Sequence, residues 1–414
     1  MKKLQGVKGT QDFFAEKQRL FTHVLECASN VANSFSYQEM SVPLLEHTEV
    51  FKRSLGEGSD IVHKEMYSFE DKKGRSLTLR PEFTASVVRS IISSGAQKQL
   101  PLKLFSHGPL FRYERPQKGR YRQFHQVNFE YIGSAHPMAD AEIISAANQL
   151  LKKLELKNLT LEINSLGDYS TRTEYTKALV KYFSKHTKDL SEDSKVRLQK
   201  NPLRILDSKD SKDRELIANA PMISEFWNEE SKKFFEQLLC YLDAMGIVYK
   251  RNYSLVRGLD YYAHTVFEFT TNDLGAQGTV LAGGRYDKLI KQMGGDDIPA
   301  VGFAAGIERL MELSKGKIQQ DKSISIVLFA EEYLENGLKL SEELRSKEIR
   351  TELDVVKNMN KSMKKALDSN AKFIIFIGQE EASKGLYKIK DLDSRKEEML
   401  NLSQLLNRVG SYEF

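Results

Sequence analysis

The stretch FRYERPQKGRYRQFHQVNFEYIG, residues 111–133, decides the fold of this chain. Its two ends alternate polar and apolar residues, and between them lies a basic turn that contains glycine. An alternation with a period of two predicts strands, which we place over residues 102–114 and 122–133 as an antiparallel pair. Long neighbouring antiparallel strands indicate an α+β chain and not a series of β–α–β units.

These two strands carry polar side chains on one face. Arg112 and Glu114 lie two residues apart, so their side chains should point to the same side of the first strand. The second strand presents four residues on a single face: Phe124, Gln126, Asn128 and Glu130. A face with cations, amides and carboxylates suits a zwitterionic substrate and a polyphosphate better than it suits a core. From periodicity alone, a solvated polar face beside a mobile basic turn is an equally good interpretation.

Helices and further strands surround this pair. Residues 64–80 predict a hairpin that turns at 71–74. From about 170 to 250 the sequence is helical and charged, without a strand pattern, which indicates an inserted helical module. The other expected elements are a helix over 16–35, a short strand over 37–42 ended by Pro43, a helix over 138–156, a strand within 159–167, strand character over 256–271 and 279–290, and a helix that begins within 301–314.

The sequence pattern changes after Lys315, Gly316 and Lys317. Short apolar runs now alternate with helical segments: 323–330, 351–356 and 372–378 as strands, 332–347 and 360–369 as helices. This alternation predicts a separate α/β domain over 322–414 with a partly parallel sheet. We therefore expect a first domain over 1–320, which contains the helical insertion, and a second over 322–414.

Composition excludes several classes of protein. The 62 Lys and Arg residues against 57 Asp and Glu give a net charge of +5, which is compatible with a polyanion partner without showing one. The two cysteines, Cys27 and Cys240, form no CxxC motif, and the eight histidines show no HExxH or HxxxH pairing, so we expect no protein-bound metal. No apolar run approaches about 20 residues and no secretory signal is evident, so we expect no membrane contact and a cytoplasmic location.

Three other segments carry candidate binding residues. In TLRPEFTAS, residues 78–86, Glu82 and Thr84 follow a proline, and a helix N-terminus capped by one of them is the favoured interpretation. In SLVRGLDYYAHTVFEF, residues 254–269, Arg257 and two tyrosines lie near a glycine that permits close backbone approach. Arg309 lies in the first turns of a helix that should begin near residues 302–306, where backbone N–H groups favour anions.

These motifs together identify the chain as similar to the bacterial histidyl-tRNA synthetases, a family of class II aminoacyl-tRNA synthetases. The resemblance covers essentially the whole length. The segment ending at Pro43, residues 111–133 and the segment ending GIERL resemble the three class II motifs. The most specific match is the family signature LVRGLDYYxxTVFE, present here as Leu255 to Glu268, with TLRPE and LGAQGTVLAGGRYD in support.

The resemblance implies an antiparallel sheet of six or seven strands flanked by helices, a helical insertion and a C-terminal α/β anticodon-binding domain. It implies a homodimer that joins L-histidine to ATP, carried with Mg²⁺ as a substrate complex, and then passes histidine to the 3′ end of tRNA(His). The catalytic residues would be Arg112 and Arg257, which hold the α-phosphate from opposite sides. Cations and positioning would supply most of the catalysis, because phosphoryl chemistry of this kind needs no protein nucleophile.

The resemblance also assigns binding roles. Arg112 would hold the substrate carboxylate as well, Glu114 would read the adenine amino group, and Phe124 would stack on adenine. Arg309 would cover the other face of adenine and the γ-phosphate, and Arg120 would reach the terminal phosphate. Histidine would be held at its amino and carboxylate ends and at its imidazole by Glu82, Thr84, Gln126, Glu130, Arg257, Tyr261, Tyr262 and Tyr286. The acceptor end of the tRNA would meet Arg115, Gln117 and Arg122.

Two alternatives remain open at this point. A catalytically inactive paralogue of this family serves as the regulatory subunit of ATP phosphoribosyltransferase, although such chains usually lack the C-terminal domain and the signature arginines. A class II ligase for another amino acid is the second alternative, against which the RGLDYY signature argues. Phe83 and Lys288 stand where many relatives have glycine, which leaves the fine shape of the pocket open.

Overall fold

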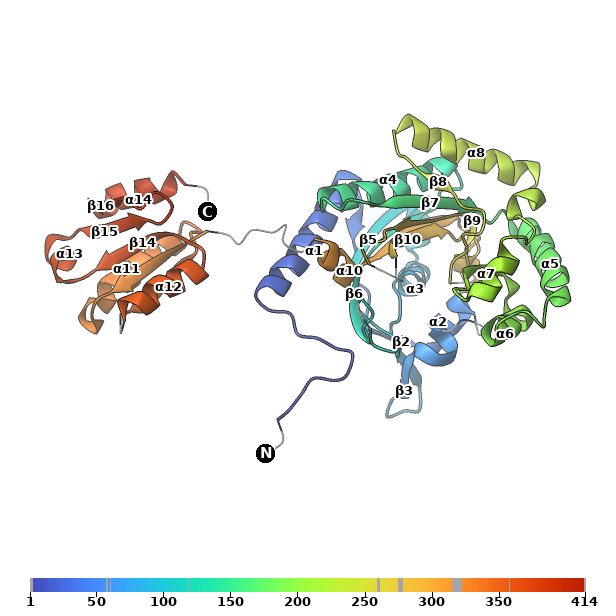
Figure 1. Cartoon of the computed structure of the whole chain (residues 1–414), viewed down its shortest axis with the longest axis horizontal. Coiled ribbons are helices and arrows are strands. Elements are labelled where there is room, and N and C mark those ends of the chain that lie inside the picture. The colour runs from blue at the N-terminus through green and yellow to red at the C-terminus, as the bar shows by residue number, and fades with distance from the viewer. Residues whose placement is uncertain are drawn as a thin grey trace. The chain divides into compact units, whose positions relative to one another are not determined.

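The computed structural model describes residues 3–56, 59, 61–117, 119–258, 261–274, 278–314, 322–356 and 358–412. The chain divides into two compact units, Met1–Ile318 and Gln319–Phe414, each built on its own sheet (Figure 1). Lys118, Asp260 and the boundary expected near 315–321 lie outside the described residues.

An eight-stranded mixed sheet organises the first unit. Its strands lie in the order β1 (Gln38–Glu39), β5 (Leu102–Phe111), β6 (Gln123–Ile132), β11 (Ala300–Gly306), β10 (Thr279–Arg285), β9 (Ala263–Thr270), β7 (Thr160–Ser165) and β8 (Lys250–Arg251). The two edge pairs, β1 with β5 and β7 with β8, are parallel, and the inner pairs are antiparallel. The α+β fold class is confirmed, and the six inner strands from β5 to β7 form the expected antiparallel sheet. The sequence did not predict the parallel pairing of the two edge strands, β1 and β8. The parallel edge strands are two exposed residues each, too short to show an alternation.

The long strand pair is confirmed as β5 and β6, in register from Leu102 opposite Ile132 to Phe111 opposite Gln123. The prediction that the first strand reaches Glu114 is wrong. The N–H of Tyr113 donates to the carbonyl of Glu65 at 2.7 Å, so the backbone leaves the ladder after Arg112.

Three other strand predictions were too long. In the region 37–42 only β1 joins the sheet, and in the region 256–271 the sheet begins with β9 at Ala263. In the region 279–290, β10 ends at Arg285 and α9 begins at Leu289. The described residues before Ala263 form a loop instead, and this loop carries part of the site described below.

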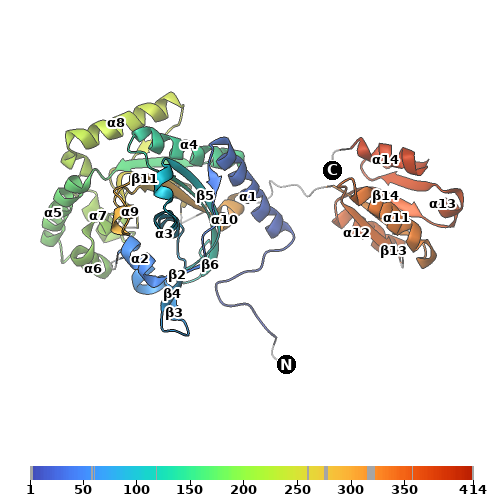
Figure 2. The ribbon, with the colours of Figure 1, turned by 180° about the vertical axis from the view of Figure 1, so that it is seen from behind.

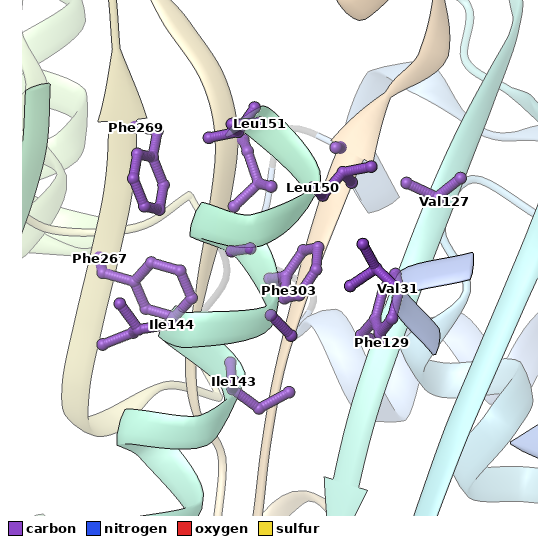
Figure 3. Close-up of a cluster of buried hydrophobic side chains, with 14 of the residues drawn as sticks. Val31, Val127, Phe129, Ile143, Ile144, Leu150, Leu151, Phe267, Phe269 and Phe303 are labelled. Atoms are coloured by element: carbon purple, nitrogen blue, oxygen red, sulfur yellow. The ribbon is translucent and has the colours of Figure 1, made fainter. Parts of the chain in front are cut away.

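Four helices cover one face of the main sheet: α1 (Glu16–Ser34), α4 (Pro137–Lys153), α8 (Glu229–Ala244) and α10 (Ile307–Leu313) (Figures 1 and 2). Odd-numbered residues of β6, such as Phe129, pack here against Phe303 and the apolar side of α4 (Figure 3). The rings of Phe129 and Phe303 are stacked with centroids 4.7 Å apart. Because side chains alternate along a strand, the even-numbered residues of β6 point to the opposite face.

The opposite face carries α2 (Thr48–Leu55), α3 (Thr84–Ser94) and α9 (Leu289–Gln292), together with a small sheet. The small sheet has the order β2 (Leu45–His47), β4 (Ser76–Leu79) and β3 (Tyr67–Glu70), and its antiparallel pair β3–β4 confirms the predicted hairpin. The region 169–226 is helical, and we call it the helical insert. It contains α5 (Tyr169–Lys185), α6 (Glu192–Lys200), η3 (Pro202–Asp207), α7 (Ser211–Ile217) and η4 (Ile223–Phe226).

The second unit is a five-stranded mixed sheet with the order β13 (Thr351–Val355), β12 (Ser323–Leu328), β14 (Ala371–Ile377), β15 (Tyr387–Asp391) and β16 (Glu397–Leu400). The pairs of β12 with β13 and β14 are parallel, as expected from the alternation, and the last two pairs are antiparallel. Its helices are α11 (Leu334–Arg345), α12 (Met359–Asp368), α13 (Gln379–Lys384) and α14 (Leu402–Gly410). The segment from β15 onward has no counterpart in the sequence prediction.

Candidate active site

A cavity of about 630 Å³ opens on the face of the main sheet opposite Figure 3, over β6, β11 and β10. The structure brings thirteen of the predicted site residues together in its wall: Glu82, Thr84, Arg112, Glu114, Arg120, Phe124, Gln126, Glu130, Arg257, Tyr261, Tyr262, Tyr286 and Arg309. They come from segments more than 200 residues apart. The volume suits a small-molecule site, because such pockets usually enclose about 300–1,000 Å³.

The cavity wall contains the carboxylate of Glu130, and this residue is only 1% exposed. It accepts a hydrogen bond from the hydroxyl of Thr84 at 2.6 Å and a second one from the hydroxyl of Tyr286. Burial raises the pKa of Glu130 to about 7, although the two hydroxyl donors lower it. The site therefore holds an acceptor with a pKa near neutrality.

A glycine makes room for this carboxylate. Gly302 lies opposite Glu130 in the β11–β6 register, and a Cβ atom there would lie 1.8 Å from Glu130 Oε2. Any side chain at position 302 would occupy the space of the carboxylate, so close approach of the backbone is required here.

Glu82 combines a structural role with a place in the cavity wall. Its carboxylate accepts the N–H groups of Thr84 and Ala85 at 2.8 and 2.7 Å and so satisfies the first turn of α3. Burial raises the pKa of Glu82, and the nearby guanidinium of Arg112 opposes that rise. The helix-capping interpretation of this motif holds for Glu82, and the same carboxylate lines the cavity.

Three tyrosine rings form the wall beside Glu130. The rings of Tyr261 and Tyr262 lie 4.7 Å apart, and those of Tyr261 and Tyr286 lie 5.6 Å apart. All three side chains are buried, and burial raises the pKa of each phenol, so each can donate a hydrogen bond at neutral pH.

Four guanidinium groups, Arg112, Arg120, Arg257 and Arg309, converge in the cavity wall, and we call them the arginine cluster. Burial lowers the pKa of Arg309, and repulsion from Arg120 and, more weakly, from Arg112 and Arg257 lowers it further. Two carboxylates form ion pairs with this cluster: Glu114 at 3.1 Å from Arg120, and Glu268 at 2.9 Å from Arg257. Glu82 is a third acidic group, near Arg112. Four cations against these three acidic groups leave an excess of positive charge, which favours a polyanion.

Backbone carbonyls orient the other two arginines of the cluster. Arg112 Nε donates to the carbonyl of Pro81 at 2.9 Å, and Arg309 Nη1 donates to the carbonyl of Thr279 at 2.5 Å. The Arg112 guanidinium lies 5.3 Å from the centroid of the Phe124 ring. A carbonyl neutralises no charge, so both groups remain available to an anion.

Three predicted residues lie elsewhere. Arg115 and Gln117 are exposed, and Arg122 places its guanidinium 4.0 Å from the centroid of the Tyr113 ring while Nε donates to the carbonyl of Glu114 at 3.3 Å. The structure does not bring these three into the cavity wall. Of the two departures from the family pattern, Phe83 lines the cavity, whereas Lys288 pairs with Asp297 at 2.7 Å.

Sequence reasoning missed two kinds of lining residue. Glu268 stands within the family signature, but nothing in the sequence indicates that it pairs with Arg257. Arg204, Leu206, Asp207 and Lys209 reach the cavity from the helical insert. Their segment has no motif, so sequence offered no signal for them.

The described part of the chain contains neither a metal-binding cluster nor a membrane-spanning helix. No group of three or more His, Cys, Asp or Glu residues there could hold a metal ion. No described helix is both long and apolar enough to cross a membrane.

Comparison with known proteins gives matches along the whole chain. The family model described as histidyl-tRNA synthetase matches residues 9–310, and the model described as anticodon binding domain matches residues 318–411. Histidine–tRNA ligase of Rickettsia bellii is 50% identical over 406 residues, which are 98% of each chain. Histidine–tRNA ligase of Wolbachia pipientis subsp. Culex pipiens is also 50% identical, over 98% of this chain and 99% of its own.

A solved structure has the same fold. The crystal structure of apo histidyl-tRNA synthetase from S. aureus aligns with a TM-score of 0.81 and 34% sequence identity. The alignment covers 98% of this chain and 99% of the other, so both units and the helical insert have counterparts in it.

Proposed function

This chain belongs to the histidyl-tRNA synthetase family, and from that membership we propose that it is a histidine–tRNA ligase. It is an aminoacyl-tRNA synthetase that activates L-histidine with ATP to histidyl-adenylate, releasing pyrophosphate, and then transfers histidine to the 3′ end of tRNA(His). The observation that carries this proposal is a buried carboxylate with two hydroxyl donors, Glu130, in the same cavity as four convergent arginines.

The Glu130 end of the cavity suits an imidazole. Glu130 accepts a hydrogen bond from one ring nitrogen, and a phenol of Tyr262 or Tyr286 serves the other. The ammonium group of histidine meets Glu82, with Thr84 and Gln126 beside it. An apolar side chain would leave these buried polar groups unpaired. Sites of this kind lower kcat/KM for an amino acid that lacks the polar group by a factor of about 10⁴–10⁵. Histidine selectivity therefore needs no separate editing domain.

The arginine cluster suits the triphosphate of ATP. Arg112 and Arg257 approach the α-phosphate from two sides and stabilise the charge that develops as the histidine carboxylate attacks. Arg309 and Arg120 hold the outer phosphates, Phe124 stacks on adenine and Glu114 accepts from its amino group. The carboxylate of Glu268, which faces Arg257, is an oxygen donor of the kind Mg²⁺ prefers, and Mg²⁺ carried by ATP would neutralise phosphate charge there.

The second unit and the exposed turn extend the proposal to tRNA. Residues 1–320 are the catalytic domain and 322–414 are the anticodon-binding domain, which the two family-model matches support. Arg115, Gln117 and Arg122 are on or beside an exposed turn and meet the acceptor end. The enzyme is a cytoplasmic homodimer. We infer both the assembly and the location from membership of the family.

The regulatory paralogue of ATP phosphoribosyltransferase is the weaker alternative. A regulatory subunit has no use for a triphosphate site, yet all four arginines of the cluster are present and oriented. Relatives that are 50% identical over nearly the full chain are named histidine–tRNA ligases.

ATP–pyrophosphate exchange with a panel of amino acids tests the proposal. We expect exchange with histidine alone. Arg112→Ala should abolish it, and Arg53→Ala, at an exposed arginine of α2 that pairs with Glu49, is the matched control that should retain it. Histidine binding without exchange would favour the regulatory paralogue, and exchange with another amino acid would contradict the imidazole site.

A further inference from the structure

The loop that leads into β9 carries three cavity residues but lies outside the sheet. We call its described residues, 255–258 and 261–262, the Arg257 loop. Arg257, Tyr261 and Tyr262 all line the cavity. Asn164 on β7 donates to the carbonyl of Leu255 at 3.0 Å and so fixes the start of the loop. A loop without ladder hydrogen bonds must be positioned by side chains if its cavity residues are to keep their geometry.

Two arginines of the helical insert supply these contacts. Arg204 Nη1 donates to the carbonyl of Gly258 at 2.5 Å, and Arg172 Nη1 donates to the carbonyl of Tyr262 at 2.7 Å. One contact lies directly after Arg257 and the other lies on a cavity tyrosine itself. Hydrogen bonds from a guanidinium are charge-assisted, and they are shorter and stronger than neutral ones.

The segment that carries Arg172 is fixed at its start. Asp168 caps α5 by accepting the N–H of Thr171 at 2.8 Å, and it also accepts from Asn228 at 2.9 Å. Burial acts to raise the pKa of Asp168, but its hydrogen-bond donors outweigh burial and lower the pKa to about 2. Arg172 follows within the first turn, so it projects from an anchored helix end.

The segment that carries Arg204 is fixed in a similar way. The carboxylate of Asp213 accepts hydrogen bonds from the hydroxyls of Ser191, Ser194 and Ser208 at 2.5–2.6 Å. These bonds tie α6, α7 and the residue after η3 together. Arg204 on η3 also forms part of the cavity wall.

We propose that Arg172 and Arg204 are positioning residues that hold the Arg257 loop from the helical insert, and that the insert thereby sets the geometry of histidine activation. This inference rests on the proposed function. Arg204 fixes the backbone next to Arg257 and therefore acts mainly on the rate of adenylate formation. Arg172 fixes the backbone of Tyr262 and therefore acts mainly on histidine binding.

The test compares Arg172→Met and Arg204→Met with wild type in steady-state ATP–pyrophosphate exchange on the full chain. Each variant should lower kcat/KM for histidine roughly ten- to a hundredfold, the range expected when the charge-assisted hydrogen bond to the loop carbonyl is lost. Arg172→Met should act mostly through a higher KM for histidine, and Arg204→Met mostly through a lower kcat. Arg172→Lys and Arg204→Lys keep a donor and should restore part of the loss. Arg214→Met, at an exposed arginine of α7, is the matched control and should behave as wild type.

Amide hydrogen exchange provides a readout that does not depend on activity. Peptides that cover residues 254–264 should exchange faster in the two methionine variants than in wild type or Arg214→Met, while peptides from α4 exchange alike in all. Wild-type kinetics together with wild-type exchange in these peptides would overturn the inference. If the wild-type chain itself shows no histidine-dependent exchange of pyrophosphate, the proposed function fails, and the amide exchange alone decides whether the insert holds the loop.

Discussion

Glu130 makes the stability of the first unit depend on pH. Its folded pKa is about 7, against about 4.5 for an ordinary glutamate, because the carboxylate is buried. Between these two values the unfolded chain has already lost the proton that the folded chain retains. The free energy of unfolding therefore falls as pH rises from about 4.5 to about 7. Above pH 7 this decrease in the free energy of unfolding is complete.

The size of this decrease follows from the two pKa values. A tenfold change in a dissociation constant corresponds to about 1.4 kcal/mol, so the ceiling for Glu130 is about 3 kcal/mol. Between pH 5 and pH 8 the expected change is about 2–3 kcal/mol. Glu130→Gln has nearly the same shape and does not titrate, so it removes this dependence. Relative to wild type, the variant should gain about 2–3 kcal/mol in unfolding free energy from pH 5 to pH 8.

Urea unfolding followed by tryptophan fluorescence measures this difference. Trp227 is the single tryptophan of the chain, and its indole N–H donates to the carbonyl of Ser165 at 3.1 Å, so its signal reports on the unit that contains Glu130. Glu49→Gln, at an exposed glutamate of α2, controls for the loss of a carboxylate. Parallel curves of unfolding free energy against pH for Glu130→Gln and wild type would refute the reasoning.

Other substitutions test neighbouring parts of the structure. Gly302→Ala should abolish histidine binding in calorimetry, since the new Cβ would lie 1.8 Å from the Glu130 carboxylate; an unchanged affinity would contradict the geometry. Asp140→Asn should lower the unfolding free energy by about 3–5 kcal/mol in the same urea titration, because it leaves the fully buried Arg285 without its main counter-charge. Arg257→Ala should lower kcat/KM in pyrophosphate exchange by several powers of ten with an unchanged circular dichroism spectrum, and wild-type kinetics would remove Arg257 from the mechanism.

Regular patterns in the sequence predicted the elements that have long, one-sided burial. The alternation from Phe124 to Glu130 predicted a strand with one polar face, and in the structure the even-numbered residues line the cavity while Phe129 packs in the core. The sequence pattern also predicted the hairpin and the parallel strands of the second unit. It did not predict the parallel pairing of the two-residue edge strands or the loop before Ala263, because their conformation depends on tertiary hydrogen bonds and not on a repeating pattern.

The residue roles at the site came from the family resemblance, since sequence spacing cannot show which side chains meet. Nothing in the spacing relates Arg257 to Glu268 or requires a glycine opposite Glu130. Contacts to backbone carbonyls are still harder to foresee, because a carbonyl is present at every residue. The contacts by which Arg172 and Arg204 hold the Arg257 loop go to such carbonyls, so no pairing of residue types marks these contacts in the sequence.

The cavity concentrates groups that oppose folding when it is empty. Glu82 and Glu130 are buried carboxyls with raised pKa values, and burial together with repulsion from the other arginines of the cluster lowers the pKa of Arg309. In the proposed reaction each of these groups meets its complement: the ammonium and imidazole of histidine meet the carboxylates, and the phosphates meet the arginines. Strain of this kind is tolerated because the apolar core on the other face of the same sheet holds the strands in register (Figure 3). Substrate binding therefore relieves a repulsion among charged groups that is present in the folded protein without substrate. Histidine and ATP together should stabilise the first unit more than either ligand alone.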